Sequence, residues 1–237
     1  MTDQAASPLS REERAPGLFI ALEGGDGSGK STQARMLAER LRAEGHDVLL
    51  TREPGGTDVG ERLRSLVLDP ENAPIDPVTE ALVFAASRSA HVRQLIRPAL
   101  AAGRTVVTDR YVDSSVAYQG AGRELGTETI ADLNTWATDG LQPDLTVLLD
   151  VDTATASTRR DARQQAPGGL GPDRMESEPE TFHHRIRQAF MDRAAAAPER
   201  YAVLDAGRPA EDLAADILAG VRSRVRSRAN GTPEARR

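Results

Sequence analysis

GGDGSGKS, residues Gly24 to Ser31, matches the pattern G-x-x-x-x-G-K-[ST] of a phosphate-binding loop, or P-loop. The loop follows a short apolar run, Leu18–Leu22, and precedes a helix-compatible stretch, Ser31–Glu44, which is the context that the motif requires. Its glycines let backbone N–H groups curl around phosphate oxygens, and the next helix adds a favourable dipole at its N-terminus. Lys30 can reach the β- and γ-phosphates, and the Ser31 hydroxyl can hold Mg²⁺. The sequence therefore predicts a nucleotide phosphate site.

Lys30 is the only lysine in the chain, since arginine supplies the rest of the 30 basic side chains. An ammonium is compact, whereas a guanidinium is wide and planar. A single lysine kept inside this loop indicates a site that an arginine would not fit. The loop and Mg²⁺ alone suit any P-loop protein, so they predict nucleotide use but not the reaction.

Four further apolar runs are typical of buried parallel strands and alternate with helix-compatible segments. The runs are Val48–Leu50, Thr105–Thr108, Leu145–Leu149 and Tyr201–Leu204. The helical segments are Ser31–Glu44, Gly60–Leu68, Pro77–Ala102, Thr127–Thr138, Ala154–Arg163, Glu180–Ala196 and Glu211–Ser223. With the run before the P-loop, this alternation predicts an α/β fold with a five-stranded parallel sheet flanked by helices. Ligands of such sheets bind outside the carboxyl ends of the strands, so functional residues are expected there.

The length of 237 residues suits one domain. We expect it to span residues 17–222, between a flexible tail at 1–16 and another at 223–237. The stretch Gln164–Pro172 is rich in Gly and Pro and separates two helical segments. It suits a mobile lid and a plain surface loop equally well.

Composition narrows the function classes. Without cysteine there is no disulfide framework and no thiolate metal site, and a net charge of -6 argues against broad nucleic-acid binding. No run has the apolar length of a signal peptide or a membrane span, so we expect a cytoplasmic protein with no membrane contact. The histidines show no metal-ligand spacing and are expected at the surface or in packing; they are His46, His91, His183 and His184.

Beyond the P-loop, the sequence resembles the thymidylate kinase family along most of residues 18–220. Four blocks carry the resemblance: FIALEGGDGSGKSTQ at Phe19–Gln33, TREPGGTDVGERLR at Thr51–Arg64, DRYVDSSVAYQGAGR at Asp109–Arg123 and DRME at Asp173–Glu176. The resemblance implies a P-loop nucleoside monophosphate kinase-like fold with a lid at about residues 159–178. It also implies transfer of the γ-phosphate of ATP to dTMP with Mg²⁺, in a homodimer formed through the apolar faces of the Pro77–Ala102 and neighbouring helices.

The family's phosphate-binding residues fall on matching positions of this sequence. The P-loop positions that would hold ATP are Gly24, Gly27, Ser28, Gly29, Lys30, Ser31 and Thr32. Asp109 is then the Mg²⁺-side carboxylate with Ser31, and Arg110 bridges the donor and acceptor phosphates. Lys30, Arg110 and Asp109 are thus expected in catalysis. The residue pattern alone leaves a buried structural salt bridge open for Asp109 and Arg110.

The dTMP site is implied in the same way. Asp26 matches the acceptor of the sugar 3′-OH, and Glu53 and Arg64 belong to the thymidylate site, with Arg64 near the acceptor phosphate. We expect the Glu53–Pro54 peptide to be cis, because the family's matching proline makes a tight turn. A Pro-Gly turn capped by an ion pair would give the same local pattern.

The base and sugar pocket has its own expected residues. Phe84 and Arg88 lie one helical turn apart, where an aromatic plate and a guanidinium can meet one planar ligand, although a core Phe beside a solvated Arg is the commoner explanation of such a pair. By resemblance, Phe84 stacks on thymine and Arg88 donates to its O4. Ser115 and Gln119 can read N3–H and the carbonyls, and Tyr118 packs against the sugar near C2′.

The lid would supply a further positive charge for phosphoryl transfer. Arg159 and Arg163 lie one turn apart and Arg174 follows the Gly/Pro-rich stretch, so closure could bring guanidinium groups over the transferring phosphoryl. Exposed arginines on a charged helix would look the same. Gly27 stands where other members of the family carry a P-loop arginine, so this chain resembles the lid-arginine type. We expect Arg163 to be catalytic and Arg159 to lie beside adenine.

Two other functions also use a P-loop. Another P-loop nucleotide or deoxynucleoside kinase, such as one acting on a 5′-OH, would need a carboxylate base and no arginine pair for an acceptor phosphate. A non-enzymatic nucleotide switch would carry a guanine-reading N-K-x-D segment or a segment that positions the catalytic water. Because Lys30 is the sole lysine, the N-K-x-D segment is absent.

Overall fold

A computed structural model of the chain describes residues 17–166 and 171–230. Its sheet is formed by β1 (Phe19–Glu23), β2 (Val48–Arg52), β3 (Thr105–Asp109), β4 (Leu145–Asp150) and β5 (Tyr201–Asp205), all parallel, in the order β2-β3-β1-β4-β5. The prediction of a five-stranded parallel sheet flanked by helices is confirmed. Since β1 is central, the P-loop that follows it lies at the middle of the sheet's carboxyl edge.

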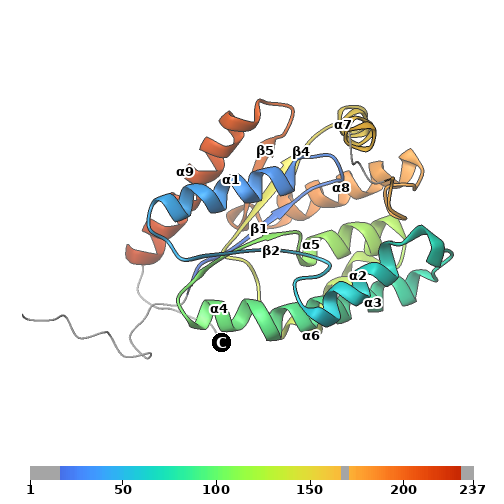
Figure 1. Cartoon of the computed structure of the whole chain (residues 1–237), viewed down its shortest axis with the longest axis horizontal. Helices are drawn as coiled ribbons and strands as arrows, with labels where there is room; N and C mark the ends of the chain where they lie inside the picture. The colour runs from blue at the N-terminus through green and yellow to red at the C-terminus, as the bar shows by residue number, and fades with distance from the viewer. Residues whose placement is uncertain (1–16, 167–170, 231–237) are drawn as a thin grey trace, which may run out of the picture.

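Helices cover both faces of the sheet (Figure 1). One face carries α1 (Lys30–Ala43) and α9 (Ala210–Asn230). The other carries α3 (Pro77–His91), α4 (Arg97–Ala101), α5 (Val112–Ser115), α6 (Thr127–Thr138) and α8 (Glu180–Ala196). Outside these lie α2 (Asp58–Leu68), packed on α3, and α7 (Thr153–Gln165), the helix of the predicted lid. Short helical turns complete the description: η1 (Pro70–Asn72), η2 (Val92–Ile96), η3 (Val116–Gly122) and η4 (Pro198–Arg200).

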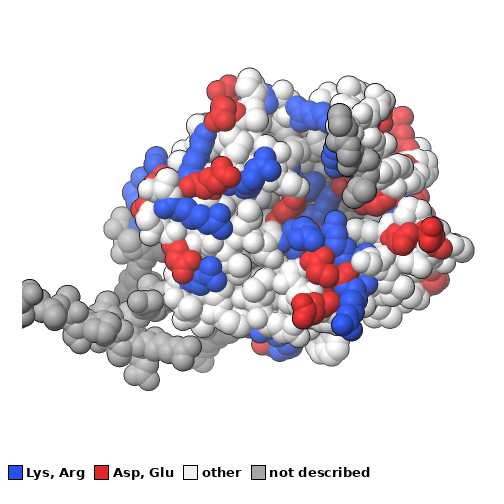
Figure 2. Space-filling view, in the orientation of Figure 1, with Lys and Arg blue, Asp and Glu red and all other residues white. Residues whose placement is uncertain are grey.

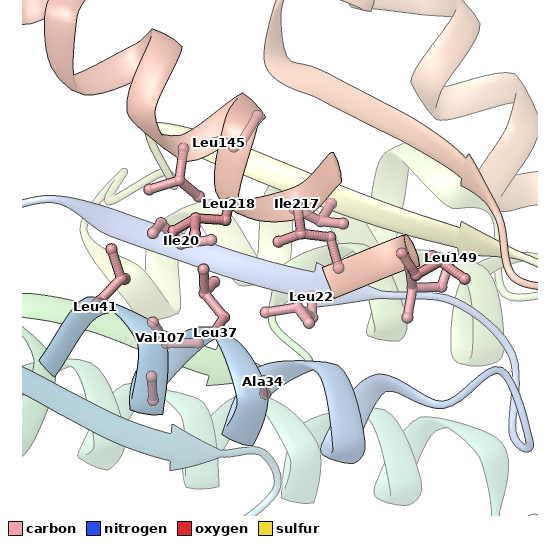
Figure 3. Packing of buried hydrophobic residues seen from close by; sticks show 14 of the residues in the cluster. Ile20, Leu22, Ala34, Leu37, Leu41, Val107, Leu145, Leu149, Ile217 and Leu218 are labelled. Carbon is pink, nitrogen blue, oxygen red and sulfur yellow. The ribbon is translucent and has the colours of Figure 1, made fainter. Parts of the chain in front are cut away.

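Strand alternation builds a core on each side of β1. Ile20 and Leu22 point to the α1 and α9 face, where they pack with residues such as Leu37 and Ile217 (Figure 3). Phe19 and Ala21 point the other way, into a cluster with η2 and α4. Burial on both faces explains why the strand reads as a continuous apolar run.

Helix starts follow ordinary capping chemistry. Thr57 accepts a hydrogen bond from the Gly60 N–H at the start of α2, and Asp76 accepts from two N–H groups at the start of α3. The helix α1 is different, because its N-cap is Gly29 at φ 92 with no side-chain cap. Its free N–H groups are therefore left facing the P-loop.

Three segments differ from the sequence-based expectation. The helix predicted at 77–102 is interrupted by the π-helical turn Val92–Ile96, because Pro98 has no N–H to donate and its ring crowds the preceding turn. The helical turns from Val112 to Gly122 were not predicted. The last helix extends beyond Ser223 to Asn230, so the first part of the predicted flexible C-terminal tail is helical.

Some expectations concern residues outside the described ranges. These are the N-terminal tail, residues 167–170 of the predicted lid and residues 231–237 of the predicted C-terminal tail. Within the described ranges, no helix has the length and apolar character needed to cross a membrane.

Candidate active site

A cavity of about 430 Å³ opens at the carboxyl ends of the central strands, where the topology predicts ligands. On the same face, Figure 2 shows basic and acidic side chains gathered in and beside a hollow. Most of the predicted site residues line the cavity. They are Asp26, Gly27, Gly29, Lys30, Ser31, Thr32, Glu53, Arg64, Phe84, Arg88, Asp109, Arg110, Ser115, Tyr118, Gln119, Arg159 and Arg163. Gly24 and Ser28 belong to the same loop but are not among the lining residues.

Lys30 lies inside the P-loop and is 6% exposed. Its Nζ donates to the Gly25 carbonyl oxygen at 2.7 Å and lies 3.4 Å from the Ser28 Oγ. Burial, and next the charge of Arg110, lower the pKa of Lys30 to about 8. The ammonium is therefore desolvated and close to titration in the ligand-free protein, so it is well placed to gain an anionic partner.

Asp109 ends β3 directly opposite the P-loop helix. Its Oδ2 accepts a hydrogen bond from the Ser31 hydroxyl at 2.5 Å. Its Oδ1 is buried and has no hydrogen-bond partner among the described residues. A buried carboxylate oxygen without a partner, next to a hydroxyl, is a ready-made position for a hard cation.

Arg110 follows Asp109 in the left-handed region, at φ 74. Its guanidinium donates to Asp26 Oδ1 at 2.5 Å, to the Gly24 carbonyl at 3.1 Å, to the Tyr118 hydroxyl at 3.1 Å and to Ser114 Oγ at 2.9 Å. A non-glycine residue keeps this conformation only where its surroundings hold it there. The contacts fix the side chain against the P-loop.

Asp26 is held in its ionised form. Burial opposes this, but the charges of Arg110 and Lys30 outweigh it and leave the pKa of Asp26 well below its usual range. The second carboxylate oxygen accepts from the Tyr118 hydroxyl at 2.7 Å. The predicted sugar-side residues Asp26 and Tyr118 are thus in direct contact.

A buried carboxylate at the end of β1, Glu23, was not predicted as a site residue. It is 0% exposed, and accepts from the Ser114 hydroxyl at 2.6 Å and from the Tyr111 N–H at 2.8 Å. Burial, and next the charge of Asp113, raise the pKa of Glu23 to about 7. Because Ser114 also receives Arg110, Glu23 supports the Arg110 side chain from behind. The sequence signal that could have identified Glu23 is a single carboxylate in a strand that is otherwise apolar.

Arg88 is buried, and its guanidinium is held in a network of hydrogen bonds. Its Nε donates to Glu53 Oε2 at 2.6 Å, one terminal nitrogen to Ser115 at 2.8 Å and to Asn134, and the other to the Tyr111 carbonyl at 3.0 Å. These contacts use four of its five N–H groups. The remaining donor is available to a ligand in the cavity.

His91 and Asn134 complete this network and were not predicted. The His91 Nδ1 lies 2.9 Å from Glu53 Oε1 and its Nε2 lies 2.7 Å from the Thr51 hydroxyl. Burial acts to raise the pKa of Glu53, but the charge of Arg88 and the contact with His91 outweigh it, and the pKa of Glu53 lies below its ordinary value. His91 was expected in packing or at the surface, but it is a hydrogen-bonded part of the Glu53 site. The Glu53–Pro54 peptide is cis, as predicted.

The remaining pocket residues lie as follows. Phe84 is half-buried and lines the cavity with Arg88, as their spacing predicts. Arg64 donates to the Pro54 carbonyl at 2.9 Å. The Gln119 Nε2 donates to the buried carboxylate of Glu80 at 2.9 Å.

The predicted lid arginines separate into two groups. Arg159 donates to the Ala206 carbonyl at 2.9 Å, Arg163 pairs with Glu176, and both line the cavity. Arg174 is instead 9% exposed, pairs with Glu80 at 2.6 Å and does not line the cavity, and its movement over the phosphates on lid closure stays a prediction. Its side chain anchors the end of the lid against α3.

The helix α7 packs directly on the P-loop. Arg160, which was not predicted, donates to the Asp26 carbonyl at 3.2 Å. A Cβ at Gly27 would lie 2.4 Å from the Ala156 carbonyl oxygen. The absence of a side chain at Gly27 is therefore required by the helix that carries Arg159 and Arg163.

Comparisons with known proteins agree with this geometry. Residues 22–217 match a protein-family model described as thymidylate kinase. The chain is 54% identical to the thymidylate kinase of Clavibacter sepedonicus over 203 residues, which cover 86% of this chain and 93% of that protein. It is 51% identical to that of Deinococcus radiodurans over 208 residues, covering 88% and 98%, and 50% identical to that of Leifsonia xyli subsp. xyli over 217 residues, covering 92% and 100%.

Proposed function

The chain belongs to the thymidylate kinase family and phosphorylates dTMP to dTDP with ATP, in the supply of dTTP; from that premise we propose which of its residues perform the reaction. One observation carries the assignment. A single cavity joins the P-loop lysine, Lys30, to the Phe84 and Arg88 pocket, with Arg110 lining it as well. A donor phosphate at Lys30 and an acceptor base at Phe84 and Arg88 would therefore bind within one cavity.

We propose that Lys30, Arg110 and Arg163 are the catalytic cations. A phosphate oxygen of dTMP forms a bond to the γ-phosphorus of ATP while the bond from that phosphorus to the ADP oxygen breaks. The acceptor oxygen is already anionic, so no residue need remove a proton. Catalysis then consists of in-line positioning and neutralisation of charge on the equatorial oxygens, which fixed cations supply.

Mg²⁺ fits the residues at the head of the P-loop helix. Asp109 Oδ1 is buried without a partner among the described residues, and the Ser31 hydroxyl is adjacent. Oxygen donors of this kind suit Mg²⁺, which keeps several waters and binds through one or two protein groups and phosphates. The chemistry that the ion would supply when bound is neutralisation of negative charge on the phosphates. Asp109 and Ser31 would hold the ion, directly or through its waters.

The remaining P-loop residues would hold the ATP phosphates through backbone N–H groups, and Arg159 would lie beside adenine. Gly29 frees the first N–H groups of α1 for this purpose. We propose that Arg163 leaves Glu176 for the γ-phosphate when ATP is bound, because a salt bridge with a 58% exposed arginine is weak.

For the acceptor, Phe84 would stack on thymine and Arg88 would give its remaining N–H to O4. Arg64 would bind the dTMP phosphate, and Asp26 the 3′-OH. The Tyr118 ring, fixed by its hydroxyl bond to Asp26, would occupy the space that a ribose 2′-OH needs.

A homodimer is proposed on the outer faces of α2, α3 and α6, which pack side by side. Large apolar side chains are exposed there: Val59, Leu66, Val78, Leu82 and, most of all, Trp136, which is 80% exposed. A patch of this kind marks an interaction surface. We also propose a cytoplasmic location. Changing Leu82 to Glu should give a monomer in light-scattering measurements, whereas the control Val225→Glu on α9 should not.

The function is tested by following ADP formation with a panel of acceptors. We expect dTMP to be preferred, dUMP to be weaker, and UMP and thymidine to be poor. Equal turnover of UMP and dTMP would contradict the proposed pocket, and preferential turnover of thymidine would favour the nucleoside kinase rival. In Tyr118→Ala the ratio of dUMP to UMP turnover should fall, while Tyr118→Phe should retain it because the ring remains.

A further inference from the structure

A buried carboxylate outside the cavity holds one of the pocket side chains. Glu80 lies on α3 and is 0% exposed. Its oxygens accept from the Gln119 Nε2 at 2.9 Å and from Arg123 at 3.1 Å, and lie 2.6 Å from the Arg174 guanidinium. No sequence motif pointed to this residue, because its partners lie far along the chain.

The charge on Glu80 decides which way the Gln119 amide faces. Two guanidinium groups favour the ionised carboxylate, and an ionised carboxylate can only accept hydrogen bonds. If the amide turned over, Gln119 Oε1 would face Glu80 Oε1, which would put two acceptors in contact and remove the hydrogen bond between the two side chains in a buried place. The orientation with Nε2 toward Glu80 is therefore fixed by the network and not by the pocket.

The other side of the same amide belongs to the cavity. Gln119 lines it, together with Arg88 and Ser115, and its Oε1 receives no hydrogen bond from the described residues. An amide offers an acceptor beside a donor. In one orientation that pair complements the N3–H and a neighbouring carbonyl of thymine or uracil; turned over, it complements the unprotonated N3 and the amino group of cytosine.

We propose that Glu80 is a positioning residue for base specificity: it locks the Gln119 amide with its oxygen toward the pocket, so that the site takes pyrimidines that carry a proton on N3 and rejects cytosine. The inference rests on the proposed dTMP site. Glu80 would contribute to the discrimination against cytosine separately from Arg88, because Glu80 acts through Gln119 and does not contact the base.

The test compares kcat/KM for dTMP, dUMP and dCMP. In Glu80→Gln the neighbour can donate as well as accept, so both amide orientations become possible. We expect the ratio of dTMP to dCMP to fall about tenfold, the effect of one mispaired polar group. The ratio of dTMP to dUMP and the KM for ATP should stay at parental values, since neither depends on N3. Gln119→Met should lower the dTMP to dCMP ratio similarly, and adding Glu80→Gln to it should have no further effect on the ratio.

A matched control separates orientation from loss of charge. Glu178 pairs with the same Arg123, at 2.6 Å, but does not contact Gln119. Glu178→Gln should keep the parental dTMP to dCMP ratio. A parental ratio in folded Glu80→Gln or in folded Gln119→Met would overturn the proposal. Failure of the parent itself to phosphorylate dTMP would instead overturn the proposed function.

The parent protein decides the matter if Glu80→Gln does not fold. With ¹⁵N-labelled glutamine, the Gln119 side-chain amide is identified by its absence from the spectrum of Gln119→Met. One of its protons should be shifted downfield and slow to exchange, and should keep that shift when dTMP binds, because it faces Glu80. An amide that averages between two orientations, or a proton whose shift moves to that of a base contact, would refute the lock.

Discussion

Replacing Lys30 by methionine should remove a pH dependence of stability that the buried ammonium imposes on the ligand-free, metal-free protein. Burial lowers the pKa of Lys30 from its ordinary 10.5 to about 8. The unfolded chain therefore binds this proton more tightly than the folded protein does. At neutral pH this difference lowers the free energy of unfolding. The gap corresponds to about 3 kcal/mol at roughly 1.4 kcal/mol per pH unit. The loss of stability is fully present below pH 8, where Lys30 is protonated in both states. It disappears as the pH rises toward 10.5.

The measurement is a pair of thermal melts, at pH 7 and pH 10, for the parent and for Lys30→Met. Other groups titrate in both proteins, so their contribution cancels in the difference. Between the two pH values the parent should gain about 2 to 3 kcal/mol over the variant, or about 5 to 10 °C in melting temperature for a chain of this size. Bound ATP should weaken the effect, since its phosphates favour the charged lysine. A gap between the two melting temperatures that is the same at both pH values would refute the reasoning.

Three further predictions concern single side chains. Lys30→Arg should melt near the parental temperature and bind dTMP almost normally, yet lose about 10² to 10³ in kcat, because the loop cannot seat a planar group; near-parental kcat in steady-state assays would contradict this. Arg163→Ala should lower kcat with little change in the KM for dTMP, whereas Arg159→Ala should mainly raise the KM for ATP; the reverse pattern would exchange their roles. Glu53→Gln should destabilise the protein by about 3 kcal/mol or more in denaturant titrations, because it leaves the Arg88 guanidinium buried without its counter-charge; an unchanged unfolding midpoint would show that the pair adds nothing.

Local patterns predicted the fold well. The five apolar runs became the five strands with ends within about two residues. The central strands β1, β3 and β4 are buried on both faces and are therefore apolar over most of their length, whereas the edge strands β2 and β5 are only partly buried. The helices Thr127–Thr138 and Glu180–Ala196 match their predicted bounds. The extension of α9 past Ser223 differs from the prediction, because this segment lacks an apolar face but contains arginine, which is a good helix former.

The site residues that could be predicted from the sequence are those that belong to contiguous motifs. Lys30, Asp109 and Arg110 belong to motifs whose spacing has its own meaning, and all three line the cavity. Asn134 and Glu80 could not be found this way, because their partners Arg88 and Gln119 are 46 and 39 residues away and are brought close only by the packing of α3, α6 and η3. Local sequence patterns do not show which residues of distant segments come into contact in the folded protein. Those contacts are what make Asn134 and Glu80 part of the pocket's surroundings.

The contact between Gly27 and α7 has a consequence for how such enzymes can diverge. A side chain at position 27 and the helix that carries Arg159 and Arg163 would occupy the same space, since even a Cβ would meet the Ala156 carbonyl at 2.4 Å. An arginine could not be added to this P-loop while the lid helix stays in place. A side chain at position 27 and α7 in its present place are therefore alternatives: a charge could be introduced at this position of the P-loop only together with a displacement of α7.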